Sequence, residues 1–473
     1  MKKFYVTNSI PYVNASPHIG HALEFLQTDV IKRFHKEILN EETLLLCGSD
    51  ENALKNVQAA EKAGVPVQDF VDKNAVLFQN LAEKLNIEFD IFQKGSDAAH
   101  HFKASQNLWN LCDKNGDIYK KEYRGLYCVG CETFYNADEL NEIGECFEHL
   151  GKKLDEVSET NYFFKLSKYR EQLIELISTD KLSILPNSRK NEVLSFLKQP
   201  LHDISVSRSN ERAKNWGVPV PNDDTQRIYV WFDALNIYQS GVGFGWNDDM
   251  YKKWWPADAQ VVGKGITRFH AVYWPAFLLS AGLELPKQLL VHGYVTVEGE
   301  KMSKTIGNVV DPFGLIEKYG TDPIRYYLLR EIPTSGDGDF SEKRFKELYT
   351  ADLANGLGNL VARVTKLAEG QKLGTKIPTQ MSGKCSDLIH KFEFSRALQS
   401  IWDQISTVDG EINKAEPWKI TDQELKNEFL ATAVNQILQI GFDLKPFLPH
   451  TSKIIFESLQ GTISKPSTLF PRL

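Results

Sequence analysis

Two histidines near the start of the chain have a spacing suited to phosphate chemistry. In the run His18-Ile19-Gly20-His21, both imidazoles lie on one face if a helix begins there. The start of a helix also offers free backbone N–H groups and the positive end of the helix dipole, and Gly20 lets a ligand approach the backbone closely. These features predict a polyphosphate site.

A second motif carries two lysines far downstream. Lys301 and Lys304 flank Met302-Ser303, directly after an expected strand and turn over Val295–Gly299. Two lysines on a loop can neutralise the charge that builds on a pyrophosphate leaving group. A lysine pair in a loop is usually just solvated, so the prediction depends on the two motifs acting together.

A third cluster has the spacing of a metal site. The sequence reads C-x2-C, fourteen residues, then C-x2-H, with candidate ligands Cys128, Cys131, Cys146 and His149. Two chelating pairs joined by a short loop are typical of a closed, structural zinc site. The alternative is a group of thiols beside a chance histidine.

Composition indicates an ordinary globular protein of two to four domains. The 473 residues are 42% hydrophobic and 25% charged, with a formal charge of -7, which argues against coating by nucleic acid. We find no apolar run of about 18 residues and no signal-peptide core after the start. We expect a cytoplasmic protein without a membrane partner.

The elements around the histidines indicate an α/β fold. Residues 4–10 form an apolar strand, Ser16-Pro17 is an expected helix cap, and apolar residues follow at helical spacing from Ile19 to Ile38. Residues 43–47 form the next strand. Strand, helix and strand in this order predict a doubly wound, Rossmann-like parallel sheet, whose ligand mouth contains residues 10–21 and 47–51.

The remaining pattern predicts five units. Residues 1–115 and 201–292 form the two halves of the catalytic domain, and residues 116–200 form an inserted connective domain with the zinc knuckle. The second half contains expected strands at 227–232, 260–263 and 289–292. Residues 293–345 form a linking module with the lysine loop. Residues 346–473 form an α-helical bundle, because apolar residues recur every three or four positions from Leu353 to Leu367.

With these motifs in this order, the sequence resembles the class I aminoacyl-tRNA synthetases, whose signatures are HIGH and KMSKS. Thr305 stands in the last place of the second signature and keeps a hydroxyl. The resemblance implies adenylate formation from ATP with Mg²⁺, followed by transfer to the 3′ end of a tRNA. It assigns catalysis to His18, His21, Lys301 and Lys304, and ATP binding to His18, Gly20, His21 and Lys304.

The segments between the signatures are most similar to the methionine-specific members of this family. The resemblance assigns methionine binding to Ile10, Tyr12, Asp50, Arg208, Trp231, Ala234, Leu235, Tyr238, Ile266, Phe269 and His270. Aromatic walls suit a polarizable thioether, and we expect Tyr12 or His270 to donate weakly to its sulfur. Taken singly, the aromatic residues could equally be core residues.

Two positions depart from the pattern of the methionine-specific members. Asn52 stands where they usually have histidine, and Gly265 stands where they often have an aspartate that helps to hold the ribose.

The same resemblance extends to tRNA. It places the zinc knuckle on the route of the acceptor end, and it assigns reading of the CAU anticodon of elongator and initiator tRNA(Met) to Asn359, Arg363 and Trp418. An aromatic side chain that stacks a base, with polar groups that read base edges, is usual in single-stranded RNA recognition. Without the resemblance, these residues read as a surface polar pair and a packing tryptophan. The chain ends soon after the bundle, so we expect a monomer.

Two other interpretations remain to be weighed. Class I enzymes for valine, leucine or isoleucine carry a longer editing insertion, and a cysteine enzyme would place zinc ligands around the substrate pocket. A non-catalytic, tRNA-binding or nucleotide-sensing relative is opposed by the intact histidine and lysine motifs.

Overall fold

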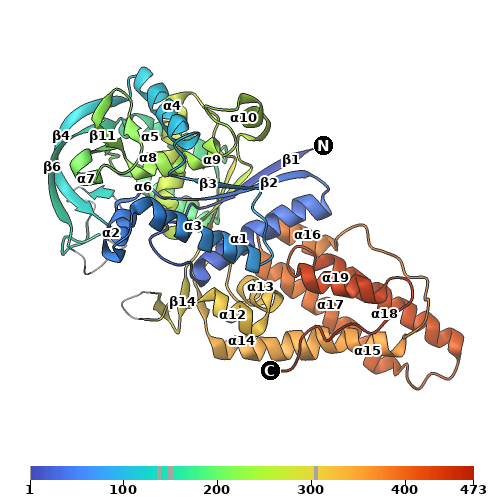
Figure 1. The fold of residues 1–473 in the computed structure, drawn as a ribbon. Helices are drawn as coiled ribbons and strands as arrows, with labels where there is room; N and C mark the ends of the chain where they lie inside the picture. The colour runs from blue at the N-terminus through green and yellow to red at the C-terminus, as the bar shows by residue number, and fades with distance from the viewer. Residues whose placement is uncertain (1, 131–132, 136–139, 147–150, 152, 303–306) are drawn as a thin grey trace.

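The computed structural model describes residues 2–473 except 131–132, 136–139, 147–150, 152 and 303–306 (Figure 1). Its centre is a six-stranded sheet in which every neighbouring pair of strands is parallel. The strand order is β3 (Ile91–Lys94), β2 (Glu42–Ser49), β1 (Lys3–Asn8), β12 (Ala259–Gly263), β13 (Gln288–His292) and β7 (Ser183–Leu185). The direction of winding reverses between β1 and β12, and ligands bind at the carboxyl ends of strands at such a point.

Helices cover both faces of this sheet, as predicted for a doubly wound fold. Alternate strand residues point to opposite faces, so Val6 and Tyr5 belong to two different apolar cores. The first core includes α1 (Ile19–Arg33) and α3 (Val67–Lys84). The second core includes α4 (His101–Lys114), α8 (Val230–Leu235) and α11 (Trp274–Ala281). The expected strands at 4–10, 43–47, 260–263 and 289–292 are confirmed in outline by β1, β2, β12 and β13.

Two smaller antiparallel sheets stand beside the parallel sheet. One has the order β5 (Thr133–Tyr135), β4 (Ile118–Cys128), β6 (Asp155–Phe164) and β8 (Ile204–Ser205). The other has the order β10 (Pro219–Val220), β11 (Asp223–Ile228) and β9 (Ser207–Ser209). Strand β7 lies within residues 116–200 but pairs with β13 in the main sheet, so sheet partnership does not follow the expected unit boundaries.

The expected strand at residues 227–232 is wrong in its second half. Strand β11 ends at Ile228, outside the main sheet, and α8 begins at Val230. The run is apolar and aromatic, which favours a strand by propensity. Burial on all sides satisfies the same composition in a helix, because the side chains of Val230 to Leu235 are all buried.

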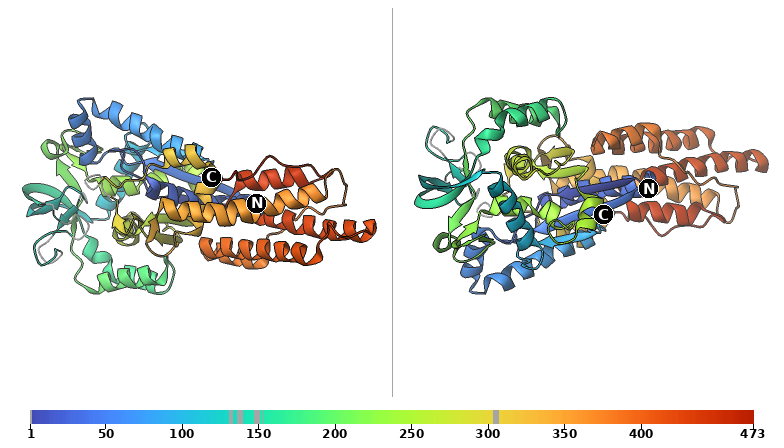
Figure 2. Two further views of the ribbon diagram at one scale, coloured as in Figure 1. Left: turned by 90° about the horizontal axis from the view of Figure 1, so that it is seen from below. Right: turned by 90° about the horizontal axis from the view of Figure 1, so that it is seen from above.

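The linking module carries a three-stranded sheet of β15 (Glu300–Lys301), β14 (Val295–Val297) and β16 (Gly338–Phe340). Helices α12 (Pro312–Tyr319) and α13 (Thr321–Arg330) lie between β15 and β16 in the chain. Helix α14 (Glu342–Leu348) continues through a π-helical stretch (Tyr349–Gly358) into α15 (Asn359–Leu367). With α16 (Gly383–His390), α17 (Phe394–Ala415), α18 (Gln423–Asp443) and α19 (Pro449–Leu459), this forms the predicted helical bundle at one end of the molecule (Figure 2).

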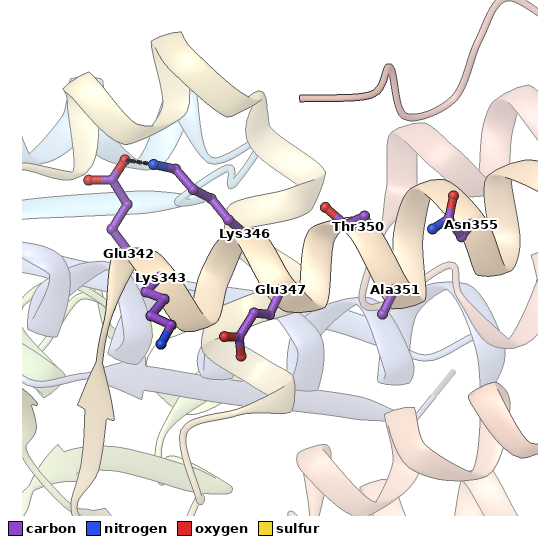
Figure 3. Close-up of a pocket in the computed structure, with 7 residues that line it drawn as sticks. All are labelled: Glu342, Lys343, Lys346, Glu347, Thr350, Ala351 and Asn355. Carbon is purple, nitrogen blue, oxygen red and sulfur yellow. Dashed lines mark ion pairs between the residues drawn. The ribbon is translucent and has the colours of Figure 1, made fainter.

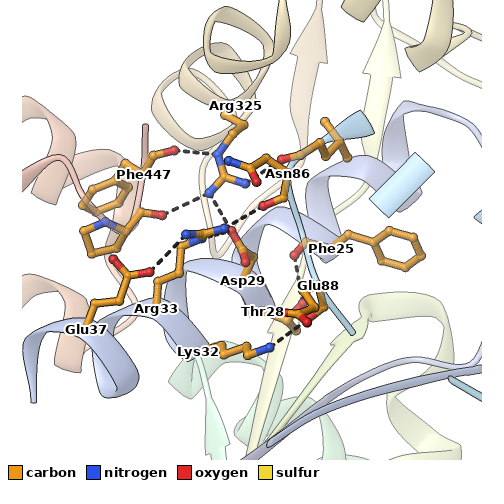
Figure 4. A network of polar contacts seen from close by, with 12 residues as sticks. Phe25, Thr28, Asp29, Lys32, Arg33, Glu37, Asn86, Glu88, Arg325 and Phe447 are labelled. Carbon is orange, nitrogen blue, oxygen red and sulfur yellow. Dashed lines mark hydrogen bonds and ion pairs between the residues drawn. The ribbon is translucent and has the colours of Figure 1, made fainter. Parts of the chain in front are cut away.

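One buried arginine links the bundle to α1 (Figure 4). Arg325, on α13, is fully buried. Its guanidinium donates to the carbonyl oxygens of Phe447 at 2.7 Å and Leu85 at 2.9 Å, and to Asp29 Oδ2 on α1 at 2.7 Å. Bundle, linking module and α1 therefore share a single polar junction inside the first apolar core.

Candidate active site

The two histidines of the first motif form the cap of α1. His18 is the N-cap residue, and its Nδ1 accepts from the backbone N–H of Gly20 at 3.1 Å. The backbone N–H of His18 in turn donates to Nδ1 of His21 at 3.1 Å. The expected cap at Ser16-Pro17 is therefore wrong, because an imidazole takes the role that a short hydroxyl or carboxylate side chain usually fills.

This reciprocal cap fixes the protonation pattern of both rings. Each Nδ1 accepts, so the neutral rings carry their proton on Nε2. The rings stack with centroids 3.9 Å apart, and burial, followed by the nearby His18 and His292, lowers the pKa of His21 well below its usual value. The motif therefore presents neutral N–H donors above the N-terminus of a helix.

Gly20 is required by the cap itself. A β-carbon at this position would lie 2.9 Å from Cε1 of His18 and 3.6 Å from Cε of Met302. Any larger residue would push the capping imidazole away from its backbone partner.

Two residues that the sequence analysis missed complete this mouth. Glu24 Oε1 accepts from the backbone N–H of Ser9 at 2.9 Å and from its hydroxyl at 2.6 Å. Glu24 Oε2 lies 2.9 Å from Nε2 of His292, whose Nδ1 is 2.8 Å from the carbonyl oxygen of Gly293. The pair connects the ends of β1 and β13 with α1. A polar residue at the carboxyl end of a parallel strand was the available signal for His292.

The lysine motif lies beside the histidine motif. Strand β15 pairs with β14, with Lys301 opposite Thr296, and the side chain of Met302 packs into the first apolar core. The backbone N–H of Ile19 donates to the carbonyl oxygen of Val310 at 3.2 Å, which ties the segment after the lysines to the start of α1. Lys304 and Thr305 lie outside the described residues.

The predicted amino-acid pocket comes together as one aromatic cluster. Trp231 on α8 stacks on Phe269 with centroids 3.7 Å apart and an angle of 4°. Tyr12 meets Trp231 edge-on at 6.2 Å, and His270 does so at 6.4 Å. Ala234 and Leu235 share α8 with Trp231 and are buried; Ile10 and Ile266 pack, half-buried, against the same core.

Two charged residues flank the cluster. Asp50 forms a parallel bridge with Tyr12, and its backbone N–H donates to the carbonyl oxygen of Pro11 at 2.9 Å. Arg208 is buried, with its guanidinium carbon 5.4 Å from the ring centroid of Tyr229 and 5.6 Å from that of Tyr127. An acid beside Tyr12 suits an ammonium ligand.

His270 does not have the donor role that we expected from the sequence. Its Nδ1 lies 3.0 Å from the carbonyl oxygen of Ile266, which only accepts. Its Nε2 lies 2.7 Å from the hydroxyl of Tyr238, which therefore donates. Burial lowers the pKa of His270 to about 4. Both ring nitrogens are engaged in a neutral ring, so neither is available to donate to a ligand.

Asn52, one of the two departures from the family pattern, supports the pocket from behind. Its amide nitrogen donates to Asp233 Oδ2 at 2.6 Å and to the carbonyl oxygen of Gly95 at 2.8 Å. The other oxygen of Asp233 accepts from Ser105 at 2.8 Å and lies 2.8 Å from Nε2 of His101. The buried Asp233 carboxylate thus fixes α8, which carries Trp231, against α4.

Two of the four expected zinc ligands can be placed. The sulfur atoms of Cys128 and Cys146 lie 3.3 Å apart in a small buried cluster. Two Zn–S bonds of about 2.3 Å at a tetrahedral angle place sulfurs about 3.8 Å apart, so this pair fits a shared ion after a small adjustment. Cys131 and His149 lie outside the described residues, and no group of three potential ligands occurs among those that are described.

The expected anticodon residues lie on the far bundle. Asn359 and Arg363 are one turn apart on α15, and Asn359 is exposed. The Arg363 guanidinium is held by α17, through Asp409 Oδ1 at 2.6 Å and Asn413 Oδ1 at 2.7 Å. Trp418, in the turn between α17 and α18, is 47% exposed, which contradicts a packing role and leaves its ring able to stack.

A depression along α14 and the π-helical stretch is separate from this chemistry (Figure 3). Its lining carries both signs of charge, and Lys346 pairs with Glu342 at 3.3 Å. Balanced charge on an exposed helix face is typical of a solvated surface.

Comparisons with known proteins identify the family. A family described as "tRNA synthetases class I (M)" matches residues 4–365. A methionine–tRNA ligase of Thermotoga maritima is 39% identical, over 96% of this chain and 75% of that protein. One from Brucella melitensis is 37% identical, over 98% and 93%. A Mycobacterium tuberculosis methionyl-tRNA synthetase bound by methionyl-adenylate superposes with a TM-score of 0.89 at 35% identity, covering 99% of this chain and 100% of that one. No described helix is long and apolar enough to cross a membrane.

Proposed function

This chain belongs to the class I tRNA synthetases of the methionine type, and from that premise we propose which of its residues perform each step. The reaction activates methionine with ATP to methionyl-adenylate and pyrophosphate, and then transfers the methionyl group to the 3′ end of tRNA. The observation that carries the proposal is the meeting of the histidine cap, the Val310 segment after the lysines and the aromatic cluster at one sheet mouth.

In the first step, a carboxylate oxygen of methionine attacks the α-phosphorus of ATP. The bond from that phosphorus to the bridging oxygen breaks, and pyrophosphate leaves with its Mg²⁺. Nε2–H groups of His18 and His21 donate to phosphate oxygens at the positive end of α1, while Lys301 and Lys304 neutralise the leaving group. This chemistry depends on positioning and charge stabilisation, without a covalent nucleophile.

The pocket selects methionine by shape and polarizability. Trp231, Phe269 and the wall made by Tyr238 and His270 enclose a thioether, with Ile10, Ala234, Leu235 and Ile266 lining the remainder. Asp50 pairs with the substrate ammonium, beside Tyr12, and Arg208 lies over the ring of Tyr229, the N-cap residue of the helix that carries Trp231. A branched aliphatic side chain would match less of this surface, although one methylene discriminates by only about 10- to 200-fold.

The histidine cap offers a test that separates chemistry from folding. In His21→Asn, the amide oxygen can still accept from the backbone of His18, but the Nε2–H donor is lost. We expect kcat for methionine-dependent ATP–pyrophosphate exchange to fall about 10²- to 10³-fold, with an unchanged melting temperature. His100→Asn on the surface is the matched control. Full exchange activity in His21→Asn would refute the assignment.

We further propose that Cys128, Cys131, Cys146 and His149 hold one structural zinc ion. A bound zinc would cross-link the loop after β4 to the segment near residue 146. The purified protein should contain about one zinc per chain, and Cys128→Ser should lose it while the far-ultraviolet circular dichroism of the whole chain stays close to that of the parent. A metal content unchanged in Cys128→Ser would contradict the site.

The bundle is proposed to read the CAU anticodon of tRNA(Met), elongator and initiator, through Asn359, Arg363 and Trp418. Trp418→Ala should lower tRNA charging strongly, because base–aromatic stacking contributes about 1–3 kcal/mol, and should spare exchange. Trp418→Phe and Leu425→Ala are the controls. Equal losses in charging and exchange would contradict the anticodon role. We also propose that the protein is a monomer in the cytoplasm, and analytical ultracentrifugation tests its oligomeric state.

A further inference from the structure

Lys55 has an unusual position for a helix lysine. It stands in the first turn of α2 (Leu54–Ala63), a turn without an acidic residue or a side-chain cap. A cation there opposes the positive end of the helix dipole, so it is unfavourable as a solvated surface charge. Its side chain is half-buried. We therefore look for a contact of the ammonium group that offsets this unfavourable position.

Two contacts involve the ammonium group of Lys55. The Lys55 ammonium lies 3.1 Å from the ring centroid of Tyr12, well within the range of a cation–π interaction. The same nitrogen donates to the carbonyl oxygen of Gly130 at 3.2 Å. Gly130 lies between the cysteines of the knuckle's first pair, so one ammonium connects that loop with an aromatic residue of the amino-acid pocket.

Tyr12 and its neighbour Trp231 are held by different kinds of contact. The backbone of Tyr12 is fixed by the bridge to Asp50, and its ring meets Trp231 edge-on, at 6.2 Å. Trp231, by contrast, is stacked flat on Phe269. The cation over the face of the Tyr12 ring favours this orientation of the ring.

We propose that Lys55 is a positioning residue that holds Tyr12 against the amino-acid pocket and couples its orientation to the knuckle loop at Gly130. The inference rests on the assignment of Tyr12 to the methionine pocket. Lys55 contacts no reacting atom; it lowers the cost of ordering Tyr12 when methionine binds.

The first test compares three variants of the full chain. Lys55→Met keeps the aliphatic stem and removes the charge, Lys55→Arg keeps a cation, and Lys62→Met is the control on the exposed end of α2. For Lys55→Met we expect the KM for methionine in ATP–pyrophosphate exchange to rise about 3- to 10-fold. The Kd for methionine, measured by tryptophan fluorescence, should rise by the same factor. The KM for ATP and kcat should stay within about twofold, as uniform binding loss predicts.

Lys55→Arg should restore the methionine KM to within about twofold of the parent value. An unchanged KM in Lys55→Met, an equal rise in Lys62→Met, or a Lys55→Arg enzyme as weak as Lys55→Met would overturn the inference. If the parent chain does not exchange with methionine at all, the proposed function fails instead, so the two failures are distinguishable.

The second test addresses the coupling to the loop. Cys128→Ser should raise the methionine KM in the parent chain, because the loop at Gly130 loses its anchor. In a Lys55→Met background the same change should add less than about twofold, since the connection is already broken and the effects of coupled residues are not additive. If the two substitutions instead raised the methionine KM by factors that multiply in the double variant, the loop would act on the pocket by another route.

Discussion

Removal of the Arg325 guanidinium should destabilise the whole chain. Arg325 is fully buried and donates to three backbone carbonyls, of Phe447, Pro446 and Leu85, as well as to Asp29. In Arg325→Met, water cannot reach these acceptors without opening the junction between α13, α1 and the bundle. Arg33 still pairs with Asp29 at 2.8 Å, so one charge remains compensated.

The magnitude follows from these contacts. A buried acceptor that loses its partner costs about 1–3 kcal/mol. Because Arg33 keeps Asp29 paired, the cost comes mainly from the three carbonyl oxygens, and we expect a total of about 3–5 kcal/mol. The unfolding entropy of a chain of this size is about 1 kcal/mol per degree, so we expect an apparent Tm lower by roughly 3–5 °C. The exposed pair of Arg344 with Glu331 provides the control, because such pairs contribute about 0–1 kcal/mol.

Scanning calorimetry of the parent chain, Arg325→Met and Arg344→Met measures both changes under one condition. A single lowered transition in Arg325→Met indicates that the junction stabilises catalytic domain and bundle together. If Arg325→Met melted within about 1 °C of Arg344→Met, the junction would contribute no more than a surface pair, and the reasoning would be refuted.

Three further outcomes are expected. Burial lowers the pKa of His270 to about 4, against about 6.5 in the unfolded chain. The stability that the neutral ring contributes is therefore complete above about pH 6.5 and is lost as the pH falls toward 4. The free energy of unfolding should fall by up to about 1.4 kcal/mol per pH unit in this window. Urea unfolding should show a shallower loss in His270→Gln over that window, and equal slopes would contradict it. Tyr238→Phe leaves Nε2 of His270 without its donor and should raise the methionine KM with little change for ATP; equal changes in both constants would contradict a pocket role. Asp409→Asn weakens the charged contact that orients Arg363 and should lower tRNA charging while exchange is preserved; loss of exchange as well would indicate general destabilisation.

Sequence alone predicted the frame because its signals are local. The strands β1, β2, β12 and β13 are apolar runs bounded by turn residues, and the bundle repeats apolar residues at helical spacing. The aromatic run at residues 230–235 was placed in a strand because propensity and periodicity cannot separate a fully buried strand from a short buried helix. Only the packing of α8 decides it, because Phe232 meets Trp109 of α4 and Phe277 of α11.

The site could be predicted as a list of residues but not as an arrangement. The Glu24–His292 contact joins residues 268 positions apart, and the local sequence around either residue does not predict the contact. The cap at His18 was missed because imidazole is rare in that role, although the same two histidines were identified for phosphate binding. His270 lies beside Trp231, but it does not have the free donor that we expected. Its two partners, the carbonyl oxygen of Ile266 and the hydroxyl of Tyr238, are evident only in the folded chain.

The central claim is that one mouth of the parallel sheet joins an ATP site to a methionine pocket. ATP–pyrophosphate exchange across methionine, valine, leucine, isoleucine and cysteine tests it most directly, with the purified full chain and Mg²⁺. The account predicts strong stimulation by methionine and at most weak stimulation by the others. Stimulation by valine or cysteine in preference to methionine, or by no amino acid at all, would contradict it.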